Sequence, residues 1–472
     1  MAKRRVFWFL LLVAFFSAGT TNKSSSLLQG NWKSLGCGKV LQIHNDRFSF
    51  FDITSISCLP ARQGPVSEFG NDIQVQNDTL SIVQGTLTYY YTRINKIPRL
   101  CTVALSEKQR SDPLYNFEVW ANTVLEHYAY FELNGVNWDS LYSAQKNKLT
   151  SQSTDVELYS VLDETLQLLH DNHGSIVPTD EVYEQAHKLK PASQEIKPLK
   201  EYGDFEIAQM VAQHYLDKEL TRDSWLIQWG KMRNNVGYIQ VKAMWLYANL
   251  NLSDSVVKQK GLATAYADKM ATYNEGEYIK KEVQGVSRTM DKVLNDLRET
   301  NYIILDIRFN GGGQDAVSME ILRRFNDKRI QVATQKFRFE KGYTPERPIV
   351  LEAADHAYTK PVYLLTSQQT ASAADLFSLA SLELPHFKRI GARTNGALST
   401  ALEKSLPNHW YFSLSNEVYE DNKGMCYENV GIPVDIELGY PKDRQAFFRW
   451  VADHLQQDKQ QVASAIEKLR TE

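Results

Sequence analysis

Hydrophobic and polar positions change their spacing along the chain, and each change marks a different kind of secondary structure. Between residues 27 and 105, short runs rich in β-branched and aromatic residues are broken by turn residues, as in Thr79-Leu-Ser-Ile-Val and Thr86-Leu-Thr-Tyr-Tyr-Tyr-Thr. Runs of this composition predict short strands, and closely spaced short strands are typical of a small antiparallel sheet or barrel. We therefore expect an N-terminal all-β domain over residues 27–105.

From residue 113 the apolar spacing lengthens to that of an α-helix. One stripe runs from Phe117 through Tyr128 to Phe131, and a second from Leu158 to Leu169, with Gly174 placed as its stop. Apolar residues three or four apart lie on one face of a helix, so both stripes predict core-facing helices. We expect a helical domain over 113–177, followed by a linker or insert with short helices over 178–235.

Strand and helix patterns alternate between residues 236 and 440. Residues 237–241 and 302–307 read as buried strands, and apolar stripes over 290–297 and 317–325 read as helices between and after them. Strands separated by helical patterns predict a layered α/β domain with a largely parallel sheet. The segment 441–472 contains an amphipathic pattern from Arg444 to about Arg470, which predicts a C-terminal helix.

One strand-to-helix transition has the features of a catalytic turn. The apolar run 362–365 reads as a strand, and the helical stripe 373–382 starts directly after Ser372. A serine there can expose its hydroxyl while the free N–H groups of the first helical turn, including that of Ala373, face a developing negative charge. The alternative is that Ser372 is only a helix N-cap, a position that serine favours.

Three other segments could complete a site with Ser372. A buried strand opens into Asn310-Gly-Gly-Gly313, and such glycines allow backbone N–H groups to approach a ligand closely. A phosphate loop would need a Lys-Ser/Thr pair, whereas Gln314-Asp315 follows, so an oxyanion hole fits better. His173 is the best candidate base for a serine, and a turn-rich segment that contains Glu428 could supply a carboxylate to orient its imidazole.

Composition and the first residues limit the location and the partners. A hydrophobic content of 43%, a charged content of 23% and a net charge of −3 are typical of a soluble globular protein and give no reason to expect nucleic acid as a partner. Three basic residues, 11 apolar residues and small residues at 17–19 predict a signal peptide over 1–19, because about 20 apolar residues are needed for a membrane span. The mature protein should therefore be exported, to the periplasm or the medium, without a membrane span.

The four cysteines would meet an oxidising compartment. Cys37, Cys58 and Cys101 fall in the N-terminal domain, where one disulfide is plausible, and Cys426 lies far along the chain. Four cysteines allow three complete pairings, and the spacing does not choose among them. None has the paired short spacing of a zinc site, and we expect neither a metal nor a cofactor.

Together, these segments resemble the ordered motifs of the tail-specific, or C-terminal processing, serine peptidases. The resemblance covers about residues 113–440 and rests on Phe131-Glu-Leu-Asn-Gly-Val-Asn-Trp138-Asp, Leu169-His-Asp-Asn-His173, Leu305-Asp-Ile-Arg308-Phe-Asn-Gly-Gly-Gly313, Thr370-Ala-Ser372-Ala-Ala-Asp375 and Tyr427-Glu428-Asn-Val-Gly431-Ile-Pro433-Val-Asp435.

The resemblance implies a crotonase-like α/β peptidase core preceded by a helical domain. It makes Ser372 the nucleophile and the amides of Gly313, Gly312 and Ala373 the oxyanion hole. Many members activate the serine with a lysine after an Arg/Lys-Thr-x-Gly turn, but here Ala397 follows that turn. The site is therefore similar to the tricorn-like branch, in which His173 and Glu428 would be the base and its partner. No PDZ pattern stands between 178 and 235.

We expect an exported serine peptidase that acts on a peptide or protein through an acyl-enzyme on Ser372. One rival is a displaced Ser–Lys dyad that uses Lys404. A second is a non-proteolytic binding protein for an apolar ligand or peptide on the same scaffold, as in interphotoreceptor retinoid-binding protein. An acyl-coenzyme A enzyme of the crotonase type fits less well, because export removes the protein from that cofactor.

Overall fold

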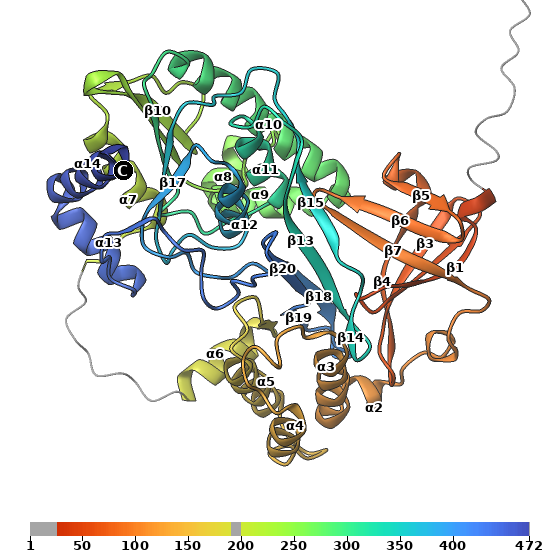
Figure 1. Cartoon of the computed structure of the whole chain (residues 1–472). Helices are drawn as coiled ribbons and strands as arrows, with labels where there is room; N and C mark the ends of the chain where they lie inside the picture. Colours follow the sequence, from red (N-terminus) through yellow and green to blue (C-terminus); the bar gives the residue numbers. More distant parts are fainter. Residues whose placement is uncertain (1–25, 190–199, 472) are drawn as a thin grey trace, which may run out of the picture.

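The computed structural model describes residues 26–189 and 200–471, so the expected signal peptide lies outside the described residues. The N-terminal part is a seven-stranded sheet in the order β4-β3-β2-β1-β7-β6-β5, and all of its pairs are antiparallel. Its strands are β1 (Gly30–Ser34), β2 (Lys39–His44), β3 (Arg47–Ile53), β4 (Cys58–Pro65), β5 (Ile73–Gln76), β6 (Thr79–Gln84) and β7 (Leu87–Ile94). The expected all-β segment is therefore present, and it lies to one side of the rest of the molecule (Figure 1).

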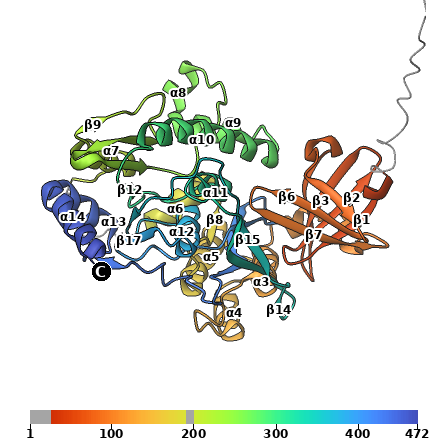
Figure 2. The ribbon, with the colours of Figure 1, turned by 45° about the horizontal axis from the view of Figure 1, so that its top comes forward.

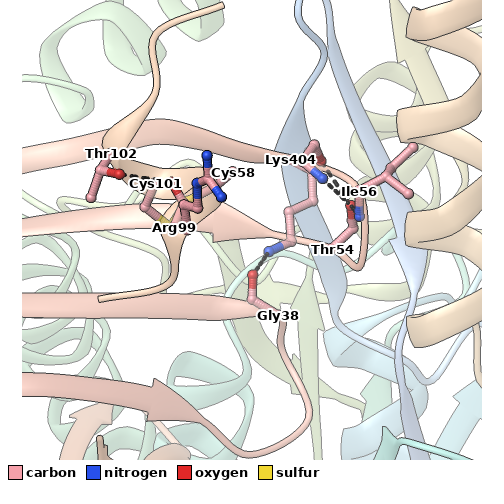
Figure 3. The surroundings of a disulfide bond; sticks show 9 residues. Gly38, Thr54, Ile56, Cys58, Arg99, Cys101, Thr102 and Lys404 are labelled. Carbon is pink, nitrogen blue, oxygen red and sulfur yellow. Dashed lines mark hydrogen bonds between the residues drawn. A yellow bond between two sulfur atoms is a disulfide. The ribbon is translucent and has the colours of Figure 1, made fainter. Parts of the chain in front are cut away.

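A disulfide closes this part of the chain. Cys58 at the start of β4 is bonded to Cys101 in the short turn Arg99–Thr102, across 43 residues of sequence (Figure 3). Cys37 and Cys426 are free thiols. One of the three N-terminal cysteines is thus left unpaired, a choice that the spacing in the sequence could not make.

A helical segment follows the sheet. It comprises α2 (Glu107–Arg110), α3 (Pro113–His127), α4 (Trp138–Lys146), α5 (Asp155–Leu169) and α6 (Asp180–Leu189). The helix α3 is shorter than its apolar stripe, because Tyr128 is extended, although its ring remains fully buried. The helix α5 ends before Gly174, because His170 adopts the left-handed conformation that stops it (φ 54°).

The core sheet has seven strands in the order β21-β17-β16-β12-β11-β10-β9. Its strands are β9 (Lys218–Glu219), β10 (Ile227–Met232), β11 (Val236–Val241), β12 (Ile303–Asp306), β16 (Val362–Thr366), β17 (Phe387–Gly391) and β21 (Ile436–Glu437). The pairs from β11 to β21 are parallel, as predicted, and those of β10 with β9 and β11 are antiparallel. The sheet therefore begins within the segment that we expected to be a linker.

Helices cover both faces of this sheet, as a parallel sheet requires. One face packs against α10 (Glu275–Leu297), α11 (Asp315–Arg323) and α12 (Ala373–Ala380). The other packs against α7 (Asp204–Tyr215), α13 (Arg444–Asp453) and α14 (Leu455–Thr471) (Figures 1 and 2). The predicted single C-terminal helix is two helices, because His454 leaves the helical conformation (φ −130°, ψ 32°).

Two smaller sheets join the parts of the molecule. The first contains β13 (Ile330–Phe339), β14 (Gly342–Tyr343), β15 (Arg347–Leu351) and β20 (Glu417–Glu420). The second has the order β18-β19-β8, with β18 (Ala401–Ser405), β19 (Tyr411–Ser415) and β8 (Ser175–Val177). The helices α8 (Asp254–Lys260) and α9 (Leu262–Met270) precede α10. Within residues 26–189 and 200–471, no helix has the length and apolar character needed to cross a membrane.

Candidate active site

Ser372 lies between β16 and α12, as the pattern predicted, in a backbone conformation that is rare for a residue with a side chain (φ 56°, ψ −124°). Its hydroxyl makes no side-chain cap of α12. The Oγ atom instead lies 3.4 Å from Nε2 of His173. Ser372 is thus the N-cap residue of α12 by position, but its hydroxyl faces His173, and such a strained turn is common at functional sites.

His173 comes from the loop between α5 and β8 and is held there by its backbone. Its N–H donates to Oδ1 of Asp171 at 3.0 Å, and its carbonyl oxygen accepts from the Ser413 hydroxyl at 2.6 Å. Asp171 in turn accepts from both the N–H and the hydroxyl of Ser415 on β19. Burial lowers the pKa of His173 below its usual value, with Asp171 acting in the opposite direction. The imidazole is therefore neutral at pH 7, as a base must be.

The glycine loop lies against the Ser372 turn. A Cβ atom on Gly312 would come within 2.6 Å of the Ser372 Cβ and 2.7 Å of the Ala371 carbonyl oxygen, so only glycine fits. The Gly312 amide donates to Oδ1 of Asn310 at 2.9 Å. Among the described residues, the amides of Gly313 and Ala373 have no acceptor. The pair of free amides expected at an oxyanion hole thus consists of Gly313 and Ala373, without Gly312.

A buried ion-pair network anchors the strand that leads into this loop. The guanidinium of Arg308, fully buried just after β12, pairs with Asp306 at 2.6 Å and with Asp458 on α14 at 2.9 Å. The Arg308 carbonyl oxygen accepts from the Ser367 hydroxyl at 2.5 Å. The sequence reasoning quoted Asp306 and Arg308 in a motif but missed Asp458, which lies 150 residues away from Arg308.

Asp375 is a second residue whose role was missed. Its buried carboxylate accepts from the Ser372 amide at 3.0 Å, the Gly396 amide at 3.1 Å and the Ala397 amide at 2.9 Å. Burial raises its pKa to about 6. The signal was present, because a serine followed three residues later by an acidic residue before an apolar run is a capping pattern.

Glu428 is buried close to the same turn but has other partners than the expected one. Its Oε2 atom accepts from the amides of Leu398 at 2.8 Å and Ser399 at 3.2 Å, and burial raises its pKa to about 8. Among the described residues, Nδ1 of His173 is buried without a hydrogen-bond partner. Glu428 therefore holds the residues just before β18, and the structure does not join it to the imidazole of His173.

Lys404, the lysine of the rival dyad, is engaged elsewhere. Its buried Nζ atom donates to the carbonyl oxygen of Gly38 at 2.7 Å (Figure 3). It also donates to the carbonyl oxygen of Cys37 at 2.8 Å and to Oδ1 of Asp52 at 2.8 Å. These three bonds use all three N–H donors of the ammonium group. Lys404 therefore joins β18 to the N-terminal sheet and cannot serve as a base for Ser372.

Ser372, His173 and Gly313 open into one cleft of about 690 Å³. Two further carboxyl groups, those of Asp315 and Glu417, line it, and burial raises the pKa of each to about 7. The hydroxyl of Tyr419 donates to Glu417 at 3.0 Å. The cleft therefore gains negative charge as the pH rises through neutrality.

A mixed α/β core that presents a serine on a strand-to-helix turn, beside a neutral histidine and free backbone amides, has the architecture of a serine hydrolase. Residues 235–438 match the family model described as Peptidase family S41. The match places this segment with peptidase family S41, and it confirms the resemblance to the C-terminal processing peptidases seen in the motifs.

Solved structures share the fold at low sequence identity. A provisionally named peptidase from Parabacteroides merdae ATCC 43184 is 18% identical, with a TM-score of 0.52, over 73% of this chain and 96% of that chain. Mature CPAF is 10% identical, with a TM-score of 0.51, over 75% of this chain and 98% of that chain. At these identities the likeness shows the fold and does not identify a substrate.

Proposed function

We propose that the protein is an exported serine peptidase that cleaves peptide bonds through an acyl-enzyme on Ser372, on a core of the crotonase type. The observation that carries the proposal is the 3.4 Å approach of the Ser372 Oγ atom to Nε2 of His173. A serine hydroxyl is a weak nucleophile until a neighbouring base accepts its proton, and a neutral imidazole is suited to that task. Hydrogen bonds of this kind commonly tighten when substrate binds.

The proposed reaction has two halves. Ser372 attacks the peptide carbonyl while His173 accepts the hydroxyl proton, and the oxyanion of the tetrahedral intermediate is stabilised by the amides of Gly313 and Ala373. His173 then donates the proton to the leaving amine, which departs and leaves an acyl ester on Ser372. A water molecule, deprotonated by the same imidazole, hydrolyses that ester and restores the serine.

Glu428 has the proposed role of orienting the imidazole and stabilising its cation. To do this its carboxylate would have to reach Nδ1 of His173, the ring atom that has no partner among the described residues. A carboxyl group with a pKa of about 8 is neutral at pH 7, but a newly formed imidazolium nearby would favour its ionisation. The negative charge of Glu428 would thus form together with the His173 imidazolium and stabilise it in the transition state.

Export is supported by the Cys58–Cys101 disulfide, because disulfides persist mainly in oxidising compartments. The same disulfide joins β4 to the turn before the helical segment, so it closes the N-terminal sheet at the point where the chain leaves it.

A fluorophosphonate probe tests the proposal, because it reacts with activated serines and needs no knowledge of the substrate. We expect wild-type protein to be labelled and Ser372→Ala to be unlabelled, whereas Ser160→Ala, which removes an exposed serine of α5, should label normally. Labelling that survives in Ser372→Ala would overturn the proposal. A wild-type protein that binds peptides but is never labelled would favour the non-proteolytic binding protein.

A further inference from the structure

The cleft at Ser372 extends to the N-terminal sheet. From the serine the cleft runs past the start of β18 and ends between the N-terminal sheet and the α9–α10 region. The far end is lined by the apolar or aromatic side chains of Phe50 and Tyr89 from the sheet, Met270 from α9, Tyr273 from the turn between α9 and α10, and Ile279 from α10, and by the charged side chains of Lys39 and Arg62 from the sheet. A chamber with several apolar and aromatic side chains, beside two basic ones, is therefore continuous with Ser372.

The N-terminal sheet is fixed in place as a wall of this cleft. Asp72, in the turn before β5, pairs with Lys280 of α10 at 2.6 Å. At the tip of the β6–β7 hairpin, a Cβ atom on Gly85 would lie 3.3 Å from the side chain of Ala316 on α11 and 3.4 Å from that of Ile279 on α10. The hairpin therefore packs against both α10 and α11. The ion pair of Lys404 with Asp52 holds the other side of the sheet to β18.

The strand β18 presents a free edge to the cleft. It is the last strand of its sheet, and Ala401, Leu402 and Glu403 line the cleft. The Leu406 amide bonds to the Trp410 carbonyl oxygen, and hydrogen-bonded pairs alternate in an antiparallel ladder. The N–H and C=O groups of Ala401 and Glu403 therefore point away from β19, and their amides have no acceptor among the described residues.

This edge connects the two ends of the cleft. The residues just before β18, Leu398 and Ser399, are held by Glu428 next to the catalytic turn. Lys404, near the other end of the strand, reaches the N-terminal sheet. A chain paired with β18 would thus run from Ser372 toward this chamber.

We propose that the peptide substrate binds as an added strand on the free edge of β18 and places a large apolar side chain in the chamber formed by Phe50, Tyr89, Tyr273 and Ile279. Main-chain hydrogen bonds to Ala401 and Glu403 supply the alignment, and the chamber supplies the selectivity. The N-terminal sheet is then part of the specificity site. The inference rests on the proposed function, since the peptide is its substrate.

Binding in the Ser372→Ala background tests the chamber independently of catalysis. Fluorescein-labelled peptides are compared in which one position at a time is Leu or Phe in place of Ala, with affinity measured by anisotropy. We expect one position at which Leu or Phe binds about tenfold or more tightly than Ala, as a buried apolar side chain should. Adding Tyr89→Ala or Tyr273→Ala should remove that preference.

Controls separate the chamber from general damage. Val83→Ala lies on the same hairpin but outside the cleft, 40% exposed, and should keep the preference. Tyr89→Phe keeps the ring and should also retain it. If no position prefers a large apolar residue, or if Tyr89→Ala and Tyr273→Ala both keep the preference, the chamber is not a substrate site, whatever the probe labelling at Ser372 shows.

N-methylated peptides test the added strand without any change to the protein. A strand offers alternate N–H groups to its neighbour, so methylation should weaken binding about tenfold at positions two residues apart and little between them. The spacing matches that of Ala401 and Glu403. If methylation at every position weakens binding equally or not at all, strand addition is overturned. If the fluorophosphonate probe does not label the wild-type protein, the proposed function is overturned instead.

Discussion

The substitution Gly312→Ala, compared with Gly311→Ala, tests whether the contact between the glycine loop and the Ser372 turn sets the catalytic geometry. A Cβ atom on Gly312 would lie 2.6 Å from the Ser372 Cβ, and ordinary contact begins near 3.4 Å, so loop and turn must separate by the difference, 3.4 − 2.6 = 0.8 Å. The residue also has a φ of +101°, which is strained for alanine. At Gly311 nothing lies within 4 Å of the added atom.

The shift predicts a large catalytic loss. The distance between Ser372 Oγ and His173 Nε2 is already 3.4 Å, so a further separation breaks the hydrogen bond. A misplacement of about 1 Å costs on the order of 10²-fold in rate. We therefore expect Gly312→Ala to lower the rate of phosphonate labelling about 100-fold, and Gly311→Ala to stay within about threefold of wild type, which is our margin for a change that adds no contact.

The assay measures the second-order rate constant of labelling together with urea unfolding, so that loss of activity is distinguished from loss of fold. A Gly312→Ala protein that is folded and labels within threefold of wild type would refute the claim that this contact sets the geometry. Equal losses in both variants would also refute it, since the added methyl group meets other atoms only at Gly312.

Four other outcomes follow from the site. The acid limb of the pH–rate profile should have its midpoint below 6.5, because burial lowers the pKa of His173, and a midpoint well above 6.5 would contradict this. Glu428→Gln should unfold at nearly the same urea concentration as wild type at pH 7 but lose about 10²-fold or more in peptide turnover, because glutamine cannot ionise beside an imidazolium. Unchanged turnover would mean that Glu428 only holds the residues before β18. Burial raises the pKa of Asp375 to about 6, so its carboxyl group stabilises the fold at low pH and loses that contribution as the pH rises through 6. In urea titrations, the stability advantage of wild type over Asp375→Asn should therefore shrink by about 1 kcal/mol between pH 5 and pH 8. A difference that stays constant with pH would contradict the raised pKa. Lys404→Met should lower the free energy of unfolding by about 3 kcal/mol, because Asp52 loses a buried partner, while the folded protein should still be labelled by the phosphonate. A folded variant that is not labelled would favour the rival hypothesis of a Ser–Lys dyad.

Local patterns in the sequence predicted the elements and several members of the site. The strand before Ser372 and the helix after it could be located because a buried strand and an amphipathic helix have different apolar spacings. The N-terminal strands, the helical segment and the parallel core strands were predicted on the same grounds. The motif resemblance then selected His173 and the glycine loop, which the fold brings to the serine.

The contacts between distant parts of the chain could not be read from those patterns. Asp458 is joined to Arg308 across 150 residues, and Lys404 to Gly38 across 366, and neither residue differs locally from an ordinary helix or strand position. Cys58 and Cys101 are partners because β4 and a later turn meet in space. Gly312 was expected to offer a free amide, but its amide is used by Asn310, a matter of loop geometry.

Trapping the acyl-enzyme tests the central claim most directly. Wild-type protein is mixed with an activated ester of a peptide acid, quenched in acid, and the modified residue is identified by mass spectrometry after digestion. The account predicts one acyl group per chain, attached to Ser372, absent in Ser372→Ala and slow to form in His173→Ala. An acyl group on another residue, or peptide hydrolysis by Ser372→Ala at the wild-type rate, would contradict it.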